Sequence, residues 1–218
     1  MSCLSGIGVD KILQHDLWEG EKTKLKSLKK QMQEMQIFIT GNYNNSISAF
    51  KTYCAKQIRE NGVKIIIVDS LQMMCSNIFH INLESEINRI IIELKNIADD
   101  HNICVITSSQ LNRQVELRHG SRRPILADLI GSETIEQHAD KVIVIHRPET
   151  YGMDIDEDGN STKGLVELII LKNKNGNTGD VVLKKDINFT ILKDFNDYME
   201  DFSGSHRRLK QIDRPSSN

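Results

Sequence analysis

The stretch IIIVDSLQMM, Ile65 to Met74, contains the pattern from which the fold can be worked out. Its four apolar residues, Ile65 to Val68, predict a buried β-strand, and Asp69 follows at once, so a carboxylate stands at the carboxyl end of that strand. Such a carboxylate can hold Mg²⁺ in nucleotide-hydrolysing proteins, directly or through water, because Mg²⁺ prefers hard oxygen ligands and keeps much of its hydration shell. The same aspartate can equally cap the next turn, so the stretch alone leaves both interpretations open.

The composition indicates a globular protein of one domain, or of one domain with a tail. The chain has 218 residues, of which 39% are hydrophobic, and a formal net charge of −2. The start of the chain lacks a basic segment followed by a long apolar run, and no run of about 18 apolar residues occurs anywhere, so we expect a cytoplasmic protein without a membrane span. Its four cysteines are far apart and include no CxxC pair. Neither a zinc site nor a disulfide framework is therefore expected.

Apolar periodicity predicts alternating helices and strands. Spacings of three and four predict helices over about 20–35, from about 46 to the glycine in ENG (60–62), and over about 83–98, with a further helix around TIEQHAD (134–140). Short apolar runs predict buried strands at QIFIT (36–40), KIIIVD (64–69), ICVITSSQ (103–110) and KVIVIH (141–146). Because a strand, a helix and a strand follow one another from residue 64 to residue 110, we expect a βαβ unit with a parallel sheet.

After residue 146 the pattern changes to that of a hairpin. The apolar segments GLVELIIL (164–171) and DVVLKK (180–185) flank KNKNGNTG (172–179), whose Asn-Gly pair is typical of a tight turn. The acidic and serine-rich end of the chain predicts a loose tail.

Polar side chains end both strands of the βαβ unit. Asp69 follows the first strand, and Ser108, Ser109 and Gln110 end the second. Because ligands of open α/β sheets bind beyond the carboxyl ends of the strands, this convergence favours a ligand site. The Gln110 amide can both donate and accept, so it could respond to a terminal phosphate. Its alternative role is to cap the loop that follows.

Taken in order, these segments resemble a known family. The series IIIVDSLQMM, VITSSQLNRQVE, RRPILADLIGSETIEQHAD, VIVIHRPE and LKNKNGNTG is similar to the C-terminal motor domain of the DnaB-type replicative helicases. The related RecA-like recombinases and clock ATPases differ from this chain in a combination of three features. These are SQLNR, the pattern RP…DL…S…IEQ.AD and an Asn-Gly hairpin tip. The resemblance covers residues 1 to about 193. It implies an α/β fold, a RecA-like P-loop NTPase core with a C-terminal β-hairpin, that works as a hexameric ring.

The resemblance implies roles for four residues at the nucleotide. Asp69 corresponds to the carboxylate linked to Mg²⁺, and Gln110 to the glutamine that reports the γ-phosphate of ATP; both are catalytic candidates. Lys172 and Lys174 correspond to a basic pair that reaches across a subunit interface to the neighbour's nucleotide. The family has an arginine at the second position, and Lys174 keeps its charge but loses the planar fork that grips a phosphate in two places. The alternative is that both are ordinary solvated lysines of a hairpin tip.

The same resemblance places single-stranded DNA against the loops after Gln110. Because the net charge is −2, DNA binding must depend on local basic groups. Arg118, Arg122 and Arg123 are the candidates, since contacts to the phosphate backbone give affinity without base choice.

A second candidate for DNA contact is the segment Gly131, Ser132 and Glu133, through main-chain donors. Here the sequence departs from the family. Ile130 and Gly131 stand where the family has an arginine and a glutamate, and Glu133 replaces a small residue with a carboxylate that repels phosphate. His138 replaces an aspartate and is expected on the surface of a helix.

Two parts of the family's nucleotide site have no match. The chain contains no GxxxxGK[ST] sequence, and GIGVDK at 6–11 lacks both its spacing and the strand before it. In the family, this loop and the glutamate that activates water precede the position of Met1. We therefore expect an incomplete core without the P-loop strand, exposed apolar edges on the two neighbours of that strand, and negligible hydrolysis by this chain alone. A misplaced start or truncated reading frame, a split gene, a decayed remnant and a piece of a phage or mobile-element helicase all remain open.

We accordingly predict a partial helicase domain over residues 1–193 and a polar, flexible tail over 194–218. The resemblance implies part of a helicase that couples ATP hydrolysis to 5′–3′ translocation and unwinding of DNA during replication. It implies ATP and Mg²⁺ as cofactors, single-stranded DNA and copies of the full-length protein as partners, and a primase and a helicase loader as candidate partners. The alternative is a non-catalytic RecA-like module or remnant that associates with a helicase ring. Whether the chain is itself an enzyme is left open by the missing parts.

Overall fold

Contacts divide the described chain into two units. The computed structural model describes residues 1–41, 46–75, 83–118, 122–156, 159–186 and 191–195. Unit 1 consists of Met1–Gln36, Arg147–Glu167 and Val181–Asn218, and unit 2 consists of Ile37–His146 and Leu168–Asp180. From residue 196 onward the predicted tail lies outside the described residues. None of the described helices is long and apolar enough to cross a membrane.

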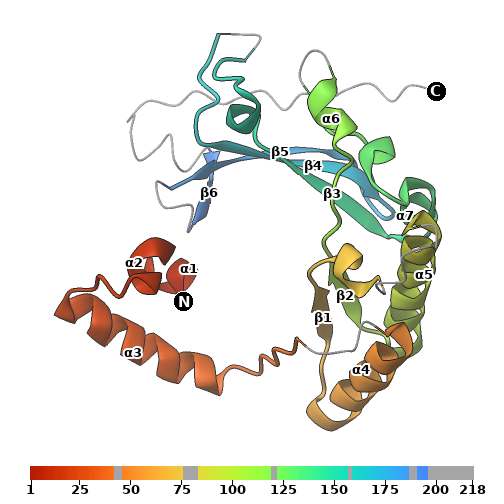
Figure 1. The fold of residues 1–218 in the computed structure, drawn as a ribbon, viewed down its shortest axis with the longest axis horizontal. Coiled ribbons are helices and arrows are strands. Elements are labelled where there is room, and N and C mark those ends of the chain that lie inside the picture. The colour runs from red at the N-terminus through yellow and green to blue at the C-terminus, as the bar shows by residue number, and fades with distance from the viewer. Residues whose placement is uncertain (42–45, 76–82, 119–121, 157–158, 187–190, 196–218) are drawn as a thin grey trace. The chain divides into compact units, whose positions relative to one another are not determined.

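Unit 2 contains the predicted βαβ unit. Strands β1 (Ile65–Val68) and β2 (Cys104–Thr107) pair in parallel, and α5 (Leu83–His101) connects them. Helix α4 (Ile47–Asn61) comes before β1 and lies with α5 on the same side of the pair (Figure 1). The predicted glycine stop of α4 is confirmed, because Gly62 ends the helix in the left-handed region at φ 65°.

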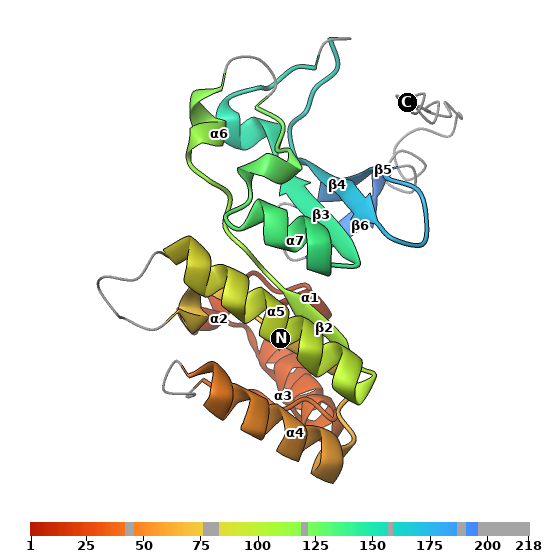
Figure 2. The ribbon, with the colours of Figure 1, turned by 90° about the vertical axis from the view of Figure 1, so that its right-hand side faces the viewer.

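Helix α5 forms the centre of the core of unit 2. It contacts α4, α7 (Ser132–His138) and β2, and Figure 2 shows it alongside both helices. Ile87 and Ile90 are 0% exposed, and they belong to one hydrophobic cluster with Val68 of β1 and Val142 of β3 (Lys141–His146). The spacing of three and four between the apolar residues of α5 puts them on a single stripe, which confirms the predicted helix.

Among the described residues, the strands of unit 2 bury side chains on one face and expose isoleucines on the other. Along β3, Val142 and Val144 are buried, whereas Ile143 and Ile145 are 54% and 63% exposed. Exposed isoleucines also occur on β1 and β2, namely Ile65, Ile67 and Ile106. The prediction that composition makes these strands fully buried is therefore wrong for one face, because burying both faces of a parallel sheet requires cover on both sides.

A second sheet has the strand order β3-β4-β5-β6, with β4 at Leu165–Asn173, β5 at Gly179–Lys185 and β6 at Leu192–Asp194. Strands β4 and β5 flank the predicted Asn-Gly turn and confirm the hairpin. The predicted strand QIFIT is wrong: residues 36–40 are not in a strand, and Ile39 is 92% exposed. A strand requires a partner for its backbone groups, and an apolar run does not create one.

Unit 1 contains the predicted helix of residues 20–35 as α3 (Glu19–Glu34), after α1 (Ser2–Ser5) and α2 (Val9–Leu13). The apolar stripe of α3 is only half-buried, at Leu25 and Met32 for example, and no residue of this helix is fully buried. The remaining described helices are α6 (Gln114–Leu117) and the 3₁₀ helices η1 (Leu71–Met74), η2 (Leu126–Asp128) and η3 (Pro148–Tyr151).

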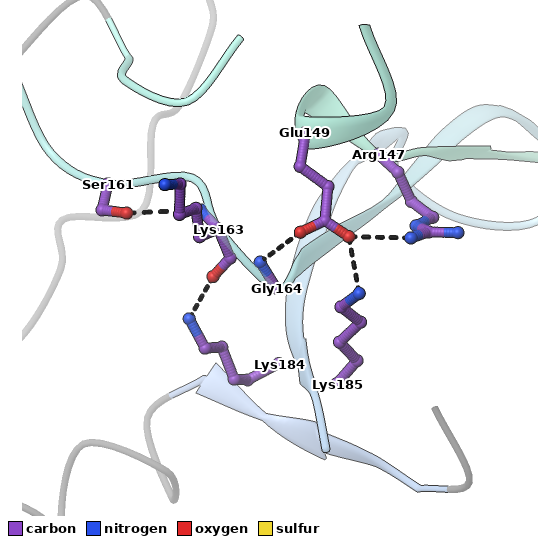
Figure 3. Close-up of polar contacts among 7 residues, drawn as sticks. All are labelled: Arg147, Glu149, Ser161, Lys163, Gly164, Lys184 and Lys185. Carbon is purple, nitrogen blue, oxygen red and sulfur yellow. Dashed lines mark hydrogen bonds and ion pairs between the residues drawn. The ribbon is translucent and has the colours of Figure 1, made fainter. Parts of the chain in front are cut away.

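Glu149 holds η3 against neighbouring segments of unit 1. One carboxylate oxygen accepts hydrogen bonds from Lys185 Nζ and Arg147 Nη2, both at 2.7 Å, and the other accepts from the Gly164 amide at 2.9 Å (Figure 3). These donors, Lys185 foremost, lower the pKa of Glu149 from 4.5 to about 2. Because the folded state favours the ionised form, Glu149 stabilises the fold above pH 4.5, and this contribution is lost as the pH falls from 4.5 towards 2.

We expect Glu149→Gln to lower the free energy of unfolding by about 1–3 kcal/mol at pH 7, since a neutral amide makes weaker bonds to these donors. Urea unfolding followed by circular dichroism measures the loss, and Glu116→Gln on α6 is the control for removal of an exposed charge. The difference in the free energy of unfolding between wild type and Glu149→Gln should become smaller below pH 4.5. If this difference is unchanged at strongly acidic pH, the loss of stability is due to altered packing and not to the charge of Glu149.

Candidate nucleotide site

Asp69 and Ser108 meet where β1 and β2 end. The Ser108 hydroxyl donates a hydrogen bond to Asp69 Oδ1 at 2.5 Å, and both residues are exposed. Backbone bonds continue the strand pairing past the ends of the strands: Ser108 N donates to Val68 O at 3.1 Å, and Leu71 N donates to Ser108 O at 3.0 Å. The backbone thus fixes a carboxylate and a hydroxyl side by side at one edge of the sheet.

The residues around this pair extend the polar edge. Gln72 Nε2 donates to Ser109 Oγ at 3.1 Å, and Gln110 follows as an exposed residue before Leu111, which bridges to Leu129. Gln72 was not among the predicted site residues, because its hydrogen bond joins residues 37 positions apart; its nearness to Asp69 is the one signal in the sequence. Gln110 lies two residues beyond Ser108, the partner of Asp69. The role of Gln110 as a phosphate sensor stays a prediction.

The donor set fits a weakly held magnesium ion. Within the described ranges, no group of three or more His, Cys, Asp and Glu side chains could hold a metal by itself. A single exposed carboxylate beside a hydroxyl is instead suited to Mg²⁺ that keeps several waters and takes further oxygens from a phosphate. Asp69 is the residue that would hold such an ion.

The two hairpin lysines are held at the junction of α7 and β3. Lys172 Nζ donates to Glu136 O at 2.5 Å, and Lys174 Nζ lies 3.4 Å from Asp140 Oδ1. The amide of Lys174 also donates to Asp140 O at 2.9 Å. Lys95 Nζ bonds the other oxygen of Asp140 at 2.9 Å, and Lys95 first and Lys174 second lower the pKa of Asp140. The lysines are therefore not simply free in solvent, although the Lys174 side chain is 63% exposed.

The predicted DNA-contacting arginines make contacts within unit 2. Arg118 Nη2 lies 2.5 Å from Asp128 Oδ1, and Arg118 Nη1 donates to Arg123 O at 3.1 Å. Arg122 Nε donates to Arg118 O at 3.3 Å, and Arg123 Nη2 bonds Asp180 Oδ2 at 2.7 Å. Because a guanidinium has five N–H donors, a group that makes such contacts can also bind a phosphate, but the contacts give these arginines a structural role as well.

Asp128 organises the loop that carries these arginines. The residue is 7% exposed, and its side chain accepts from Arg118 and from the Ile125 amide at 2.7 Å. Its carbonyl accepts from the Asn112 amide at 2.8 Å, which links the loop to the segment after Gln110. In the sequence Asp128 is only the D of DL in the family pattern and has no predicted role, because residue type does not tell a buried aspartate from an exposed one.

The segment Gly131 to Glu133 forms the start of α7. Gly131 has φ 77°, and a Cβ at this position would lie 3.0 Å from Asn88 Oδ1 and 3.1 Å from Ile87 Cγ2 of α5. Glycine is thus required by its close approach to α5. The Ser132 amide donates to Leu129 O at 3.1 Å, so this main-chain donor is already used within the chain, and Glu133 is exposed in the first turn. DNA contact by this segment stays a prediction, and the Ser132 amide is not available as a donor for it.

We expect Gly131→Ala to lower the free energy of unfolding by about 1–3 kcal/mol, because alanine is strained at this φ and its methyl group would press on α5. Thermal unfolding monitored by circular dichroism measures the shift. The matched control is Gly179→Ala in β5, where an added Cβ meets nothing within 4 Å. An equal effect at both positions would show that the contact with α5 is not the cause.

Comparisons with known proteins identify relatives of this chain. The family model of the DnaB-like helicase C-terminal domain matches residues 1–194. A probable replicative DNA helicase of Trieres chinensis is 37% identical over 174 residues, which cover 79% of this chain and 38% of that protein. The replicative DNA helicase DnaB of Rickettsia felis is 34% identical over 186 residues, covering 80% and 37%. The chain thus spans 37–38% of the length of these curated relatives.

Two solved structures share the fold. A DnaB-like replicative helicase, studied for its interactions with primase, has a TM-score of 0.74 and 27% identity, over 87% of this chain and 45% of that chain. The second structure, which we call the solved ATPase domain, has a TM-score of 0.76 and 27% identity, over 88% of this chain and 66% of that domain. The predicted fold class, an α/β RecA-like core, is confirmed by these structures.

Proposed function

Because the chain belongs to the family of DnaB-like helicase C-terminal domains, we propose that it forms part of the ATPase motor of a replicative DNA helicase. In this proposal the motor couples ATP hydrolysis to 5′–3′ translocation and to the unwinding of DNA in the cytoplasm. The observation that carries the proposal is the hydrogen-bonded pair of Asp69 and Ser108 at the carboxyl edge of β1 and β2. That edge is where open α/β sheets bind their ligands.

The chain contributes one side of the nucleotide site. Asp69 would hold Mg²⁺, and the bound ion would supply positive charge at the transferring phosphoryl group. Ser108 fixes the Asp69 carboxylate through its hydrogen bond, and Ser109 is held by Gln72. Gln110 would then meet the γ-phosphate with its amide and pass the state of the nucleotide to the segment that begins at Leu111.

The hairpin lysines contribute to a neighbouring subunit's site in a hexameric ring. Lys172 and Lys174 extend from the end of β4, and their contacts with Glu136 and Asp140 restrict the orientations of both ammonium groups. Restricting a cation before it meets its phosphate lowers the entropy lost on binding. Primase, named together with the solved DnaB-like helicase, and a helicase loader are the proposed partners of the full-length protein.

Single-stranded DNA is proposed to bind along the segment after Gln110. The guanidinium groups of Arg118, Arg122 and Arg123 would contact phosphates, since backbone contacts are independent of base sequence. The segment Gly131 to Glu133 is the second proposed contact.

The proposal is tested on a protein that joins residues 1–218 to a P-loop segment of a DnaB-like relative, because this chain contains no GxxxxGK[ST] sequence. We expect ATP-dependent unwinding of forked DNA by that protein and no measurable hydrolysis by residues 1–218 alone. A protein that hydrolyses ATP but binds no single-stranded DNA would contradict the helicase proposal.

A second candidate is a non-catalytic module that joins a helicase ring. Sequencing the DNA upstream of Met1 separates the two candidates. An in-frame P-loop supports the enzyme, whereas a stop codon supports the module.

We expect Lys174→Arg in the assembled ring to raise, or at least to preserve, the DNA-stimulated turnover of ATP. An arginine keeps the charge and adds the planar fork that binds a phosphate in two places. Steady-state phosphate release measures the turnover, with Lys56→Arg on the exposed face of α4 as the control. A collapse of turnover in Lys174→Arg alone would argue against contact with the neighbour's nucleotide.

A further inference from the structure

Helix α3 of unit 1 carries a row of positive charge along one side. Four exposed lysines follow one another at spacings of three and four residues, which places them on the same side of the helix. We call these side chains the lysine face: Lys22, Lys26, Lys29 and Lys30. From residue 22 to residue 33 the helix contains no acidic residue, whereas the whole chain has a net charge of −2. Positive charge is therefore concentrated on this side of α3.

Carboxylates of the chain do not balance the lysine face. Among the described residues, Lys22 forms an ion pair with Glu19 at 2.7 Å, and the other three lysines of the face form none. By contrast, Lys51 on α4 pairs with Glu93 at 2.6 Å. Like charges three or four residues apart repel one another and destabilise a helix. A bound polyanion would remove this repulsion.

An exposed aromatic ring extends the lysine face at the start of α3. Trp18 is the N-cap residue of the helix, four residues before Lys22, and it is 68% exposed. Its ring lies against Gly20, in the space that a Cβ at this position would fill. Glycine thus lets the ring rest on the helix backbone, while Trp18 stays open to solvent.

A basic face beside an accessible aromatic ring is the arrangement with which proteins bind single-stranded nucleic acid. Lysines contact the phosphates and bases stack on the ring, so binding requires no particular base sequence. Lys22, Lys26 and Lys30 follow one another at steps of about 6 Å along the helix axis, since each residue adds about 1.5 Å. This regular row suits a polymer with regularly spaced charges.

Other anionic partners fit this surface less well. The centres of protein interfaces are depleted of lysine and depend on aromatic and arginine anchors, so four lysines make a poor centre for a protein partner. A helix that lies in a membrane surface inserts an apolar face into it. The apolar stripe of α3 is instead half-buried, at Leu25, Leu28 and Met32, and α1 contacts this helix. The surface therefore favours a nucleic acid over an acidic protein or a membrane.

We propose that Trp18 and the lysine face of α3 bind single-stranded nucleic acid through its bases and phosphates, without sequence preference. This surface belongs to unit 1, whereas the arginines proposed to contact DNA belong to unit 2. The inference goes beyond the proposed function, because it requires neither ATP nor a ring. Its failure would leave the proposed ATPase motor untouched, and an inactive ATPase would leave this surface untouched.

The experiment measures binding of residues 1–218 to a labelled single strand of oligodeoxythymidylate by fluorescence anisotropy, at several salt concentrations. The triple variant Lys26→Gln/Lys29→Gln/Lys30→Gln should bind at least about tenfold more weakly than wild type at low salt. Each phosphate contact adds about 0.7 to the steepness with which log affinity falls against log salt, so the variant should lose about 2 of this slope. No binding by wild type, or an unchanged slope in the variant, overturns the proposal.

A matched control separates the lysine face from overall charge. Lys24→Gln/Lys56→Gln/Lys64→Gln removes the same charge from exposed positions outside the face, and it should bind the strand with a slope close to that of wild type. Glutamine and lysine have similar helix propensities, so both triple variants should melt as folded proteins. Equal weakening by the two triple variants overturns the proposal, because the overall charge would then be the cause.

Trp18 gives a second readout, because it is the only tryptophan in the sequence. The strand should quench its fluorescence, Trp18→Ala should weaken binding at least about fivefold, and Trp18→Phe should retain most of it. Equal binding by Trp18→Ala and wild type overturns the proposal. Binding to phosphatidylserine vesicles or to polyglutamate, lost in the lysine-face variant while strand binding is unchanged, also overturns it and assigns the face to a membrane or an acidic protein.

Discussion

Asp69→Ala is expected to lower ATP hydrolysis by about 100- to 1,000-fold in an ATPase that contains residues 1–218 and a P-loop. In the proposed site the substitution removes the carboxylate that would hold Mg²⁺, and the loss of one such electrostatic contact typically has an effect of this size. Nucleotide binding should survive in part, because the P-loop cradles the phosphates independently of Asp69. Phosphate release and binding of a fluorescent nucleotide measure the two effects separately.

The matched control for Asp69→Ala is Asp100→Ala, which removes an exposed carboxylate near the end of α5. It should leave turnover within the error of the assay. Unchanged turnover in Asp69→Ala would remove this residue from the nucleotide site and would favour its alternative role as a cap for the turn after β1.

The second large effect is expected in the core. Ile90→Ala should lower the free energy of unfolding of unit 2 by about 2–5 kcal/mol, since the truncation removes apolar contacts and leaves a cavity. Ile90 is 0% exposed and lies in the cluster where α5 meets α4 and the strands. Urea unfolding measures the change as a shift of the midpoint.

Ile92→Ala gives the internal comparison for that experiment, because Ile92 lies on the same helix and is 40% exposed. Ile92→Ala should lower the free energy of unfolding by less than about 1 kcal/mol, since surface substitutions change stability little. Similar losses at positions 90 and 92 would mean that α5 does not pack as described.

The parts of the fold that depend on neighbours in sequence were predictable. The stripe on α5, the glycine stop at Gly62 and the Asn-Gly hairpin follow from helix periodicity, backbone conformation and turn chemistry. The strand ending at Asp69 was also predicted correctly, because four branched apolar residues before a polar turn favour a strand.

The parts that depend on distant partners were not predictable. QIFIT has the composition of a strand, yet residues 36–40 find no strand partner among the described residues. Ile143 and Ile145 look like core residues in the sequence, but they are 54% and 63% exposed because no described segment covers that face of β3. Composition describes what a segment can bury, whereas its surroundings determine what is buried.

The candidate site shows the same division. The positions of Asp69 and Gln110 at strand ends could be inferred from the sequence, but the Gln72–Ser109 bond and the Arg118–Asp128 ion pair could not, because each joins residues brought together by folding. The arginines illustrate the consequence. Basic residues near a loop suggest nucleic-acid contacts, whereas the bonds of Arg118 to Asp128 and to the Arg123 carbonyl show that it holds this loop.

We propose that Asp69, Ser108 and Gln110 face a magnesium-bound nucleotide. Substituting paramagnetic Mn²⁺ for Mg²⁺ in the nucleotide-bound ATPase tests it most directly, with amide signals recorded by NMR. The account predicts that the signals of Ser108 and Gln110 broaden strongly, while that of Lys56 on α4 stays sharp. Sharp signals at Ser108 and Gln110, with broadening elsewhere in the chain, would contradict it.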